Sequence, residues 1–141
     1  MLFRSIEIST DALGRPHASP IRGVAPALSI AHTRDRVAAA ATFAFTSVGI
    51  DIERATAQAA GFRAGFADDE LQRFPHHDLP ALWCAKEATA KLLGTGMRGV
   101  PREWRTVAYD GCTAAIDFRG RRVQVRIDQH TDYYQIGRAH V

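Results

Sequence analysis

The chain has 141 residues, of which 46% are hydrophobic and 23% charged, as in a soluble globular protein of one domain or two small halves. Its formal charge is +3, but the basic residues are scattered among acids, which argues against a nucleic-acid-binding module. No stretch could span a bilayer and no signal peptide is visible, so we expect a cytoplasmic protein without membrane contact. Cys84 and Cys112 lack the spacing of a zinc site and are expected to be buried, reduced thiols.

The first part of the chain is predicted to be almost wholly β. Residues 5–9 alternate apolar and polar side chains, as a half-buried strand does. A turn at 13–16 and a loop with two prolines follow. Further strands are expected at 27–31, 36–45 and 48–53, with a polar turn at 32–35.

The middle of the chain is predicted to be helical and the rest to return to strands. Residues 55–74 are alanine-rich and helical in pattern, with breaks near Gly61 and Gly65, and Pro75 ends this helix. A second helix is expected from about Asp78 to about Leu93. Three strands at 104–108, 113–118 and 121–127, separated by glycine turns, predict an antiparallel meander. This order of strands, helices and strands indicates an α+β fold.

A first candidate site lies in the sequence Gly49-Ile50-Asp51-Ile52-Glu53. Side chains of a strand alternate between its faces, so Asp51 and Glu53 share one face and the isoleucines the other. Neighbouring carboxylates repel each other, and a hard cation such as Mg²⁺ removes that repulsion. The alternative is a solvated strand face without a ligand.

A second candidate site lies on the second helix, in the sequence from Trp83 to Lys91. Trp83, Glu87 and Lys91 are spaced four apart and share one face of a helix. Lys86 and Lys91 are the only lysines among 18 basic residues, which suggests a chemical role for both, although an arginine-favouring genome would give the same count. Glu87 and Lys91 could equally form a common surface pair. Together with Asp51 and Glu53 they supply carboxylates and cations of the kind phosphoryl-type transfer requires.

A GxDxE strand followed by WxxKEAxxK resembles the paired signature of the 4'-phosphopantetheinyl transferase superfamily. The resemblance extends to Gly14-Arg15-Pro16, similar to a G-[KR]-P turn, to 29–33, similar to S-x-S-H-[ST], and to 66–70, similar to F-[ST]-x-x-E. Ala31 and Ala67 depart from the pattern, and Ala31 removes a hydrogen bond expected toward a coenzyme A phosphate.

The resemblance implies Mg²⁺-dependent transfer of the 4'-phosphopantetheine group from coenzyme A to a serine of an apo acyl or peptidyl carrier protein, with release of 3',5'-ADP. The pathway would be fatty acid, polyketide or nonribosomal peptide biosynthesis. The base that deprotonates the serine would be Glu87 or a metal-bound water, with Glu70 a weaker candidate, and His32 could instead be a structural turn residue. The implied metal ligands are Asp51, Glu53 and Glu87; the implied coenzyme A contacts are Gly14, Arg15, Pro16, His32, Thr33, Lys86 and Lys91; the implied catalytic residues are Glu87, Lys91 and Glu70.

The order of the motifs resembles the longer Sfp-type branch more than the holo-acyl-carrier-protein synthase branch, because residues 1–48 with the GRP and His motifs precede the acidic strand. An Sfp-type enzyme would be a monomeric pseudodimer of two similar α+β halves, here a truncated first half at 1–48 and a second half at 49–141. Residues 2–5 and 136–141 match translated sequencing-adapter frames, so we expect both ends of the natural reading frame to be cut. The alternative function is an inactive remnant that binds coenzyme A or a carrier protein without turnover.

Overall fold

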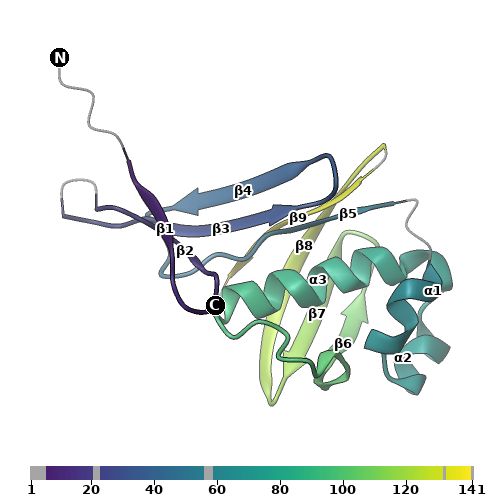
Figure 1. The fold of residues 1–141 in the computed structure, drawn as a ribbon. Helices are drawn as coiled ribbons and strands as arrows, with labels where there is room; N and C mark the ends of the chain where they lie inside the picture. Colours follow the sequence, from purple (N-terminus) through teal and green to yellow (C-terminus); the bar gives the residue numbers. More distant parts are fainter. Residues whose placement is uncertain (1–5, 21–22, 56–58, 132, 141) are drawn as a thin grey trace.

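The computed structural model describes residues 6–20, 23–55, 59–131 and 133–140, and for 59 and 135–140 it describes the backbone alone (Figure 1). The predicted adapter-encoded residues 2–5 and 141 lie outside the described residues. So does the first residue of the strand expected at 5–9. The two-half organisation and the adapter origin of the ends stay predictions.

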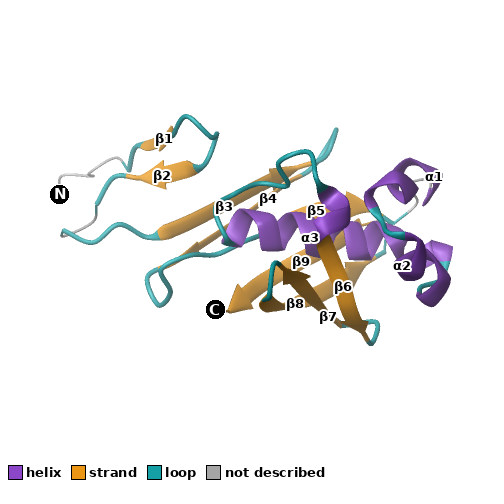
Figure 2. Cartoon of the chain, turned by 90° about the horizontal axis from the view of Figure 1, so that it is seen from below, coloured by secondary structure: helices purple, strands orange, loops and turns teal. Residues whose placement is uncertain are grey.

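The N-terminal part forms two hairpins, β1–β2 and β3–β4, and then strand β5, as Figures 1 and 2 show. The bounds are β1 (Ile8–Thr10), β2 (Pro16–Ala18), β3 (Ala27–His32), β4 (Val37–Thr42) and β5 (Asp51–Arg54). Strands were predicted at all of these places except β2, which fell in a predicted loop. The Asp11 carboxylate bends the chain into this extra hairpin by accepting hydrogen bonds from the backbone N–H of Leu13 at 2.8 Å and of Arg15 at 2.9 Å.

The helical part is shorter and more broken than the sequence pattern predicts. Its elements are α1 (Ala59–Phe62), η1 (Arg63–Gly65), α2 (Asp68–Arg73), η2 (His76–Asp78), α3 (Leu79–Leu92) and η3 (Pro101–Glu103). The predicted break near Gly65 is confirmed, because η1 ends there and Phe66 and Ala67 are extended. The predicted second helix is confirmed as α3, which ends just before Gly94. Gly94 has a φ of 68°, a backbone conformation that glycine adopts without strain.

The C-terminal part completes a five-stranded antiparallel sheet in the order β5-β9-β8-β7-β6. The bounds are β6 (Trp104–Tyr109), β7 (Thr113–Phe118), β8 (Arg121–His130) and β9 (Tyr133–His140). The predicted meander is confirmed as β6-β7-β8. Strand β9 was not predicted, and it inserts between β8 and β5, so it alone joins β5 to the meander.

Hydrophobic side chains pack against both faces of this sheet. Helix α3 crosses one face of the sheet (Figure 1) and is buried there with side chains of β6, β7 and β8 such as Trp104, Ile116 and Val125. On the other face, the β3–β4 hairpin covers β5 and β9 through a smaller cluster that includes Ala31, Ala38, Ile50, Ile52 and Tyr133. Strand β5 therefore lies between α3 and the hairpin.

Two expectations from composition come out differently. Cys84 is buried as predicted, but Cys112 is exposed, because it lies in the short turn between β6 and β7. Among the helices of the described residues, none has the length and hydrophobicity to cross a membrane.

Candidate active site

Strand β5 brings the two carboxylates of the GxDxE sequence onto the face that α3 covers. Ile50 and Ile52 pack into the cluster under the β3–β4 hairpin, whereas Asp51 bonds to a side chain of α3. The predicted division of this strand into an anchoring face and a carboxylate face is therefore confirmed.

Gly49, the first residue of this sequence, explains how β5 comes so close to α3. A Cβ placed on Gly49 would overlap the backbone carbonyl oxygen of Ala88 and would lie 2.8 Å from the backbone nitrogen of Leu92. Only glycine allows this approach of strand and helix. Sequence reasoning assigned Gly49 no role, although its fixed place in the motif was a signal for one.

Helix α3 presents a single narrow stripe that is not buried. Within α3, all of whose residues are described, only Trp83, Glu87 and Lys91 escape full burial. These are the three residues that the spacing of four placed on one face. The helix is otherwise buried on all sides, so its rotation about its own axis fixes where this stripe points.

The stripe and the acidic strand meet at Lys91 and Asp51. The Lys91 Nζ atom donates a hydrogen bond of 2.7 Å to Asp51 Oδ1. Asp51 is only 7% exposed, and its second oxygen, Oδ2, is buried with no hydrogen-bond partner among the described residues. A buried carboxylate oxygen without a partner is costly, and a cation or a donor would satisfy it.

The carboxylates around this pair raise one another's pKa. Burial, followed by the charges of Asp51 and Glu87, raises the pKa of Glu53 to about 7. Burial and the charge of Asp51 raise the pKa of Glu87, and burial raises the pKa of Asp51 against the opposing effect of Lys91. Three carboxylates thus share a region with one ammonium group, and a bound divalent cation would lower the free energy of their charged forms.

The carboxylate oxygens of this cluster are suitable ligands for a metal ion, but they do not form a preorganised metal site. No three His, Cys, Asp or Glu side chains in the described ranges are arranged so that they could hold a metal ion. Lys91 instead serves as the counter-ion of Asp51. The unpartnered Oδ2 and the raised pKa values are the features that fit the oxygen-preferring cations Mg²⁺ and Ca²⁺.

A cleft of about 780 Å³ lies beside this cluster. It is bounded by the β1–β2 hairpin, strand β3, the loop between β4 and β5, and the C-terminal end of α3. Its lining includes Gly14, Arg15 and Pro16 on one side and Glu87 and Lys91 on the other. The structure therefore brings the predicted coenzyme-binding turn to the same cavity as two of the predicted catalytic residues.

Arg15 fixes the β1–β2 hairpin at this cleft. Its Nε donates to Asp11 Oδ2 at 2.7 Å, and its guanidinium lies against Gly94, where a Cβ would come within 2.5 Å of Nη1. Asp11 and Gly94 were not predicted as site residues. Hydrogen bonds from the backbone and side chain of Arg15 hold the pKa of Asp11 well below its usual range.

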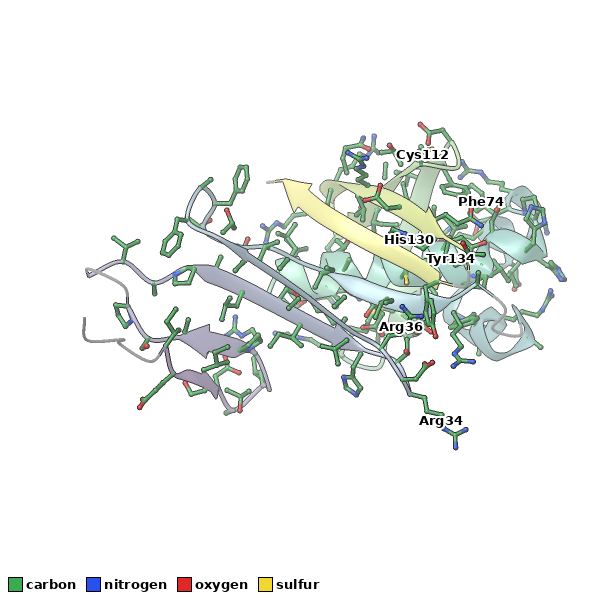
Figure 3. All side chains as sticks on the ribbon, turned by 90° about the horizontal axis from the view of Figure 1, so that it is seen from above. Arg34, Arg36, Phe74, Cys112, His130 and Tyr134 are labelled. Atoms are coloured by element: carbon green, nitrogen blue, oxygen red, sulfur yellow. The ribbon has the colours of Figure 1, made fainter. Side chains whose placement is uncertain are left out.

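His32 and Thr33 lie elsewhere, at the opposite end of β3. Neither belongs to the lining of the cleft within the described residues; His32 is exposed, and Thr33 Oγ1 bonds to Asp35 at 3.3 Å. Figure 3 shows Arg34 and Arg36 at this hairpin end, with Arg34 pointing into solvent. The structure does not bring these residues to Lys91, and their contacts with coenzyme A stay predictions.

Ser29, in the same strand as His32, has a structural role. Its buried Oγ accepts a hydrogen bond of 3.0 Å from the backbone N–H of Ile50. This bond ties the β3–β4 hairpin to the acidic strand.

Lys86 and Glu70 form a buried ion pair away from the cleft. The Lys86 Nζ lies 3.0 Å from Glu70, and both side chains are 0% exposed. Lys86 was predicted to neutralise pyrophosphate and Glu70 to be a possible base. In the structure each side chain is enclosed by protein and paired with the other, and neither lines the cleft, so both roles stay predictions.

Comparison with known proteins agrees with the two motifs. Residues 47–136, more than half of the chain, match the family model of the 4'-phosphopantetheinyl transferase superfamily. The matched range contains both Gly49–Glu53 and Trp83–Lys91. No curated protein sequence matches the chain.

Proposed function

The chain belongs to the 4'-phosphopantetheinyl transferase superfamily, and on this premise we propose that it transfers the 4'-phosphopantetheine group of coenzyme A to a serine of an acyl or peptidyl carrier protein, releasing 3',5'-ADP. Membership supports phosphopantetheine transfer in general. The observation that carries the finer proposal is the meeting of Asp51 with Lys91 at a cleft that also contains the Gly14–Pro16 turn.

We propose Asp51, Glu53 and Glu87 as the residues that hold Mg²⁺. The support is the raised pKa of each carboxyl and the unpartnered Asp51 Oδ2. When bound, the cation would neutralise negative charge on the pyrophosphate of coenzyme A.

The remaining chemistry falls to Glu87 and Lys91. The carrier serine Oγ forms a bond to the β-phosphorus, and the bond from that phosphorus to the bridging oxygen of 3',5'-ADP breaks. Glu87, partly accessible at the cleft, accepts the serine proton, and the Lys91 ammonium stabilises negative charge on the phosphate oxygens. Arg15 and its turn bind the nucleotide end of coenzyme A. Catalysis of this kind depends mainly on positioning and charge neutralisation.

A mass-shift assay tests this proposal. The chain is incubated with apo carrier protein, coenzyme A and Mg²⁺, and the carrier is expected to gain the mass of one phosphopantetheine group. Asp51→Asn and Glu87→Gln should each lower the rate by at least about 100-fold. The matched control Asp128→Asn removes a surface carboxylate paired with Arg126 and should keep the full rate.

Two outcomes would contradict the proposal. Full turnover by both Asp51→Asn and Glu87→Gln would reject the metal and base assignments. Calorimetric binding of coenzyme A by the unsubstituted chain without any transfer would identify a binding protein without turnover.

A further inference from the structure

The buried Lys86–Glu70 pair connects helices α2 and α3 with strand β6. Besides Lys86, the Glu70 carboxylate accepts hydrogen bonds from the backbone N–H of Thr106 at 2.7 Å and of Ala67 at 3.0 Å. These bonds tie the start of α2 and strand β6 to the middle of α3. Both side chains are fully buried and pair with each other, and the Arg105 Nε lies 3.8 Å from the same Glu70 carboxylate.

Lys86 makes two more contacts on the segment before α2. Its Nζ donates to the carbonyl oxygen of Gly65 at 3.1 Å and lies 4.0 Å from the centre of the Phe66 ring. Gly65 is the last residue of η1. Lys86 thus holds the backbone of η1 by a carbonyl group.

The Trp83 ring contacts Gly65 from another side. A Cβ on Gly65 would overlap the Trp83 ring, so the ring rests directly on the glycine backbone. Phe62 packs beside it, with ring centroids 5.8 Å apart. Two side chains of α3, Lys86 and Trp83, therefore clamp Gly65 between them.

The clamp sits next to the stripe that contains Glu87. Trp83 is one turn before Glu87 on the same face, and Lys86 directly precedes it. To bind a cation, the carboxylates of Asp51, Glu53 and Glu87 would have to be held within about 0.5 Å and roughly 10–20° of the binding geometry. A small rotation of α3 would turn Glu87 away from Asp51 and Glu53.

We propose that the Lys86–Glu70 pair is a positioning pair, which holds Gly65 against Trp83 and so fixes the rotation of α3 that aims Glu87 at Asp51 and Glu53. Lys86 touches neither the metal nor coenzyme A; among the two lysines, Lys91 alone meets the ligand. The part of this inference that concerns metal affinity rests on the proposed function. The part that concerns the clamp does not.

The test uses the double variant Lys86→Met/Glu70→Gln, which removes both charges of the pair. Arg105, whose Nε lies 3.8 Å from Glu70, is partly exposed and keeps its ion pair with Asp69. Three properties of the folded chain are measured: the affinity for Mg²⁺ by calorimetry, the affinity for coenzyme A without metal, and acrylamide quenching of tryptophan fluorescence. The chain has two tryptophans, and Trp104 is fully buried, so quenching reports mainly on Trp83. Lys91→Met is the comparison for a lysine that meets the ligand.

The expected result is a folded double variant with Mg²⁺ affinity lowered by about 10-fold or more and with stronger quenching, as for loss of a group that orients a metal ligand. Its metal-free affinity for coenzyme A should stay within about 2-fold, whereas Lys91→Met should lose about 10-fold or more. A loss of metal-free coenzyme A affinity equal to that of Lys91→Met would overturn the proposal, because Lys86 would then be a ligand. Unchanged quenching and unchanged Mg²⁺ affinity would overturn it as well.

A second variant covers the case in which the double variant does not fold. Gly65→Ala leaves the ion pair in place but pushes the Trp83 ring, and it should also lower Mg²⁺ affinity and raise quenching. Gly61→Ala is its control, because a Cβ placed there has no described atom within 4 Å beyond its chain neighbours and the backbone of its own helix. If the unsubstituted chain binds neither Mg²⁺ nor coenzyme A, the proposed function fails, and the quenching of Gly65→Ala relative to Gly61→Ala still decides whether the clamp exists.

Discussion

Lys91 and Asp51 are 40 residues apart in the sequence, and a 2.7 Å hydrogen bond joins them at the point where helix α3 meets strand β5. Lys91 is partly exposed at the cleft, while Asp51 is almost buried. The ammonium group therefore pairs with a buried acid on one side and faces the cleft on the other.

Replacing Lys91 should affect stability and activity together. Lys91→Met leaves Asp51 buried without its counter-ion, at a cost of about 1–3 kcal/mol in the free energy of unfolding. The rate of carrier modification should fall by at least about 100-fold, because the phosphate oxygens lose their ammonium partner. Urea unfolding and the mass-shift assay measure the two effects. Arg121→Gln, at an exposed basic residue of β8, is the control and should change neither.

Gly49 and Gly61 should respond to alanine in opposite directions. Gly49→Ala forces a methyl group into the backbone of α3 at Ala88, which we expect to lower the free energy of unfolding by about 3 kcal/mol or more. Gly61→Ala adds a methyl group in open space on a helix and should stabilise the chain by about 0.5–1 kcal/mol. Urea denaturation of both variants gives the comparison. A Gly49→Ala chain as stable as the original would show that β5 does not pack against α3 in this way.

The chain is expected to become less stable as the pH rises, because folding raises the pKa of carboxyl groups in this cluster. Burial and the neighbouring acids raise the pKa of Glu53 from 4.5 to about 7 in the folded chain. Between these pH values the folded state keeps a proton that the unfolded state has released, so the free energy of unfolding decreases. In Glu53→Gln, the free energy of unfolding should fall by about 1–2 kcal/mol less over this pH range than in the original chain. This is smaller than the whole pKa shift of Glu53 would give, because its side chain is partly exposed to solvent.

Urea unfolding at about pH 5 and about pH 7.5, without divalent cations, measures this difference. Glu103→Gln removes an exposed carboxylate paired with Arg119 and should leave the difference unchanged. An equal pH dependence in Glu53→Gln and the original chain would mean that Glu53 does not titrate in this range.

The hydroxyl group of Tyr133 should matter more than that of Tyr134. Tyr133 donates a hydrogen bond of 2.8 Å to Asp35, which also pairs with Arg54 at 2.8 Å, and so anchors the tip of the β3–β4 hairpin to the sheet. Tyr133→Phe should cost about 1 kcal/mol in the free energy of unfolding. Tyr134→Phe, which removes a hydroxyl without a hydrogen bond in the described part of the chain, should cost less than half as much. Equal costs would argue against the hairpin anchor.

The sequence predicted the site best where the geometry of a single strand or helix determines which face a side chain lies on. The period of two in β5 placed Asp51 and Glu53 on one face, and the spacing of four in α3 placed Trp83, Glu87 and Lys91 on another; both are local properties of the backbone. The antiparallel meander also follows from short glycine turns between neighbouring strands.

The sequence predicted poorly where distant elements meet. Lys86 stands in the same motif as Lys91, but which lysine faces the cleft depends on Glu70, Gly65 and Thr106, which lie on other elements. His32 belongs to a motif associated with coenzyme A, yet β3 is long enough to carry it away from the cleft. Strand β9 was missed because its pairing with β5 and β8 depends on the whole sheet and not on a local turn.

The pairing of Asp51 with Ile136 and of Arg54 with Tyr133 sets the order in which the site can assemble. The acidic strand becomes part of the sheet only when strand β9 has joined it, and closing so long a loop is slow compared with forming the meander. During synthesis, β5 leaves the ribosome well before its partner strand exists. The carboxylates should therefore acquire their final geometry last, after the helix that shares their site has already folded against the meander.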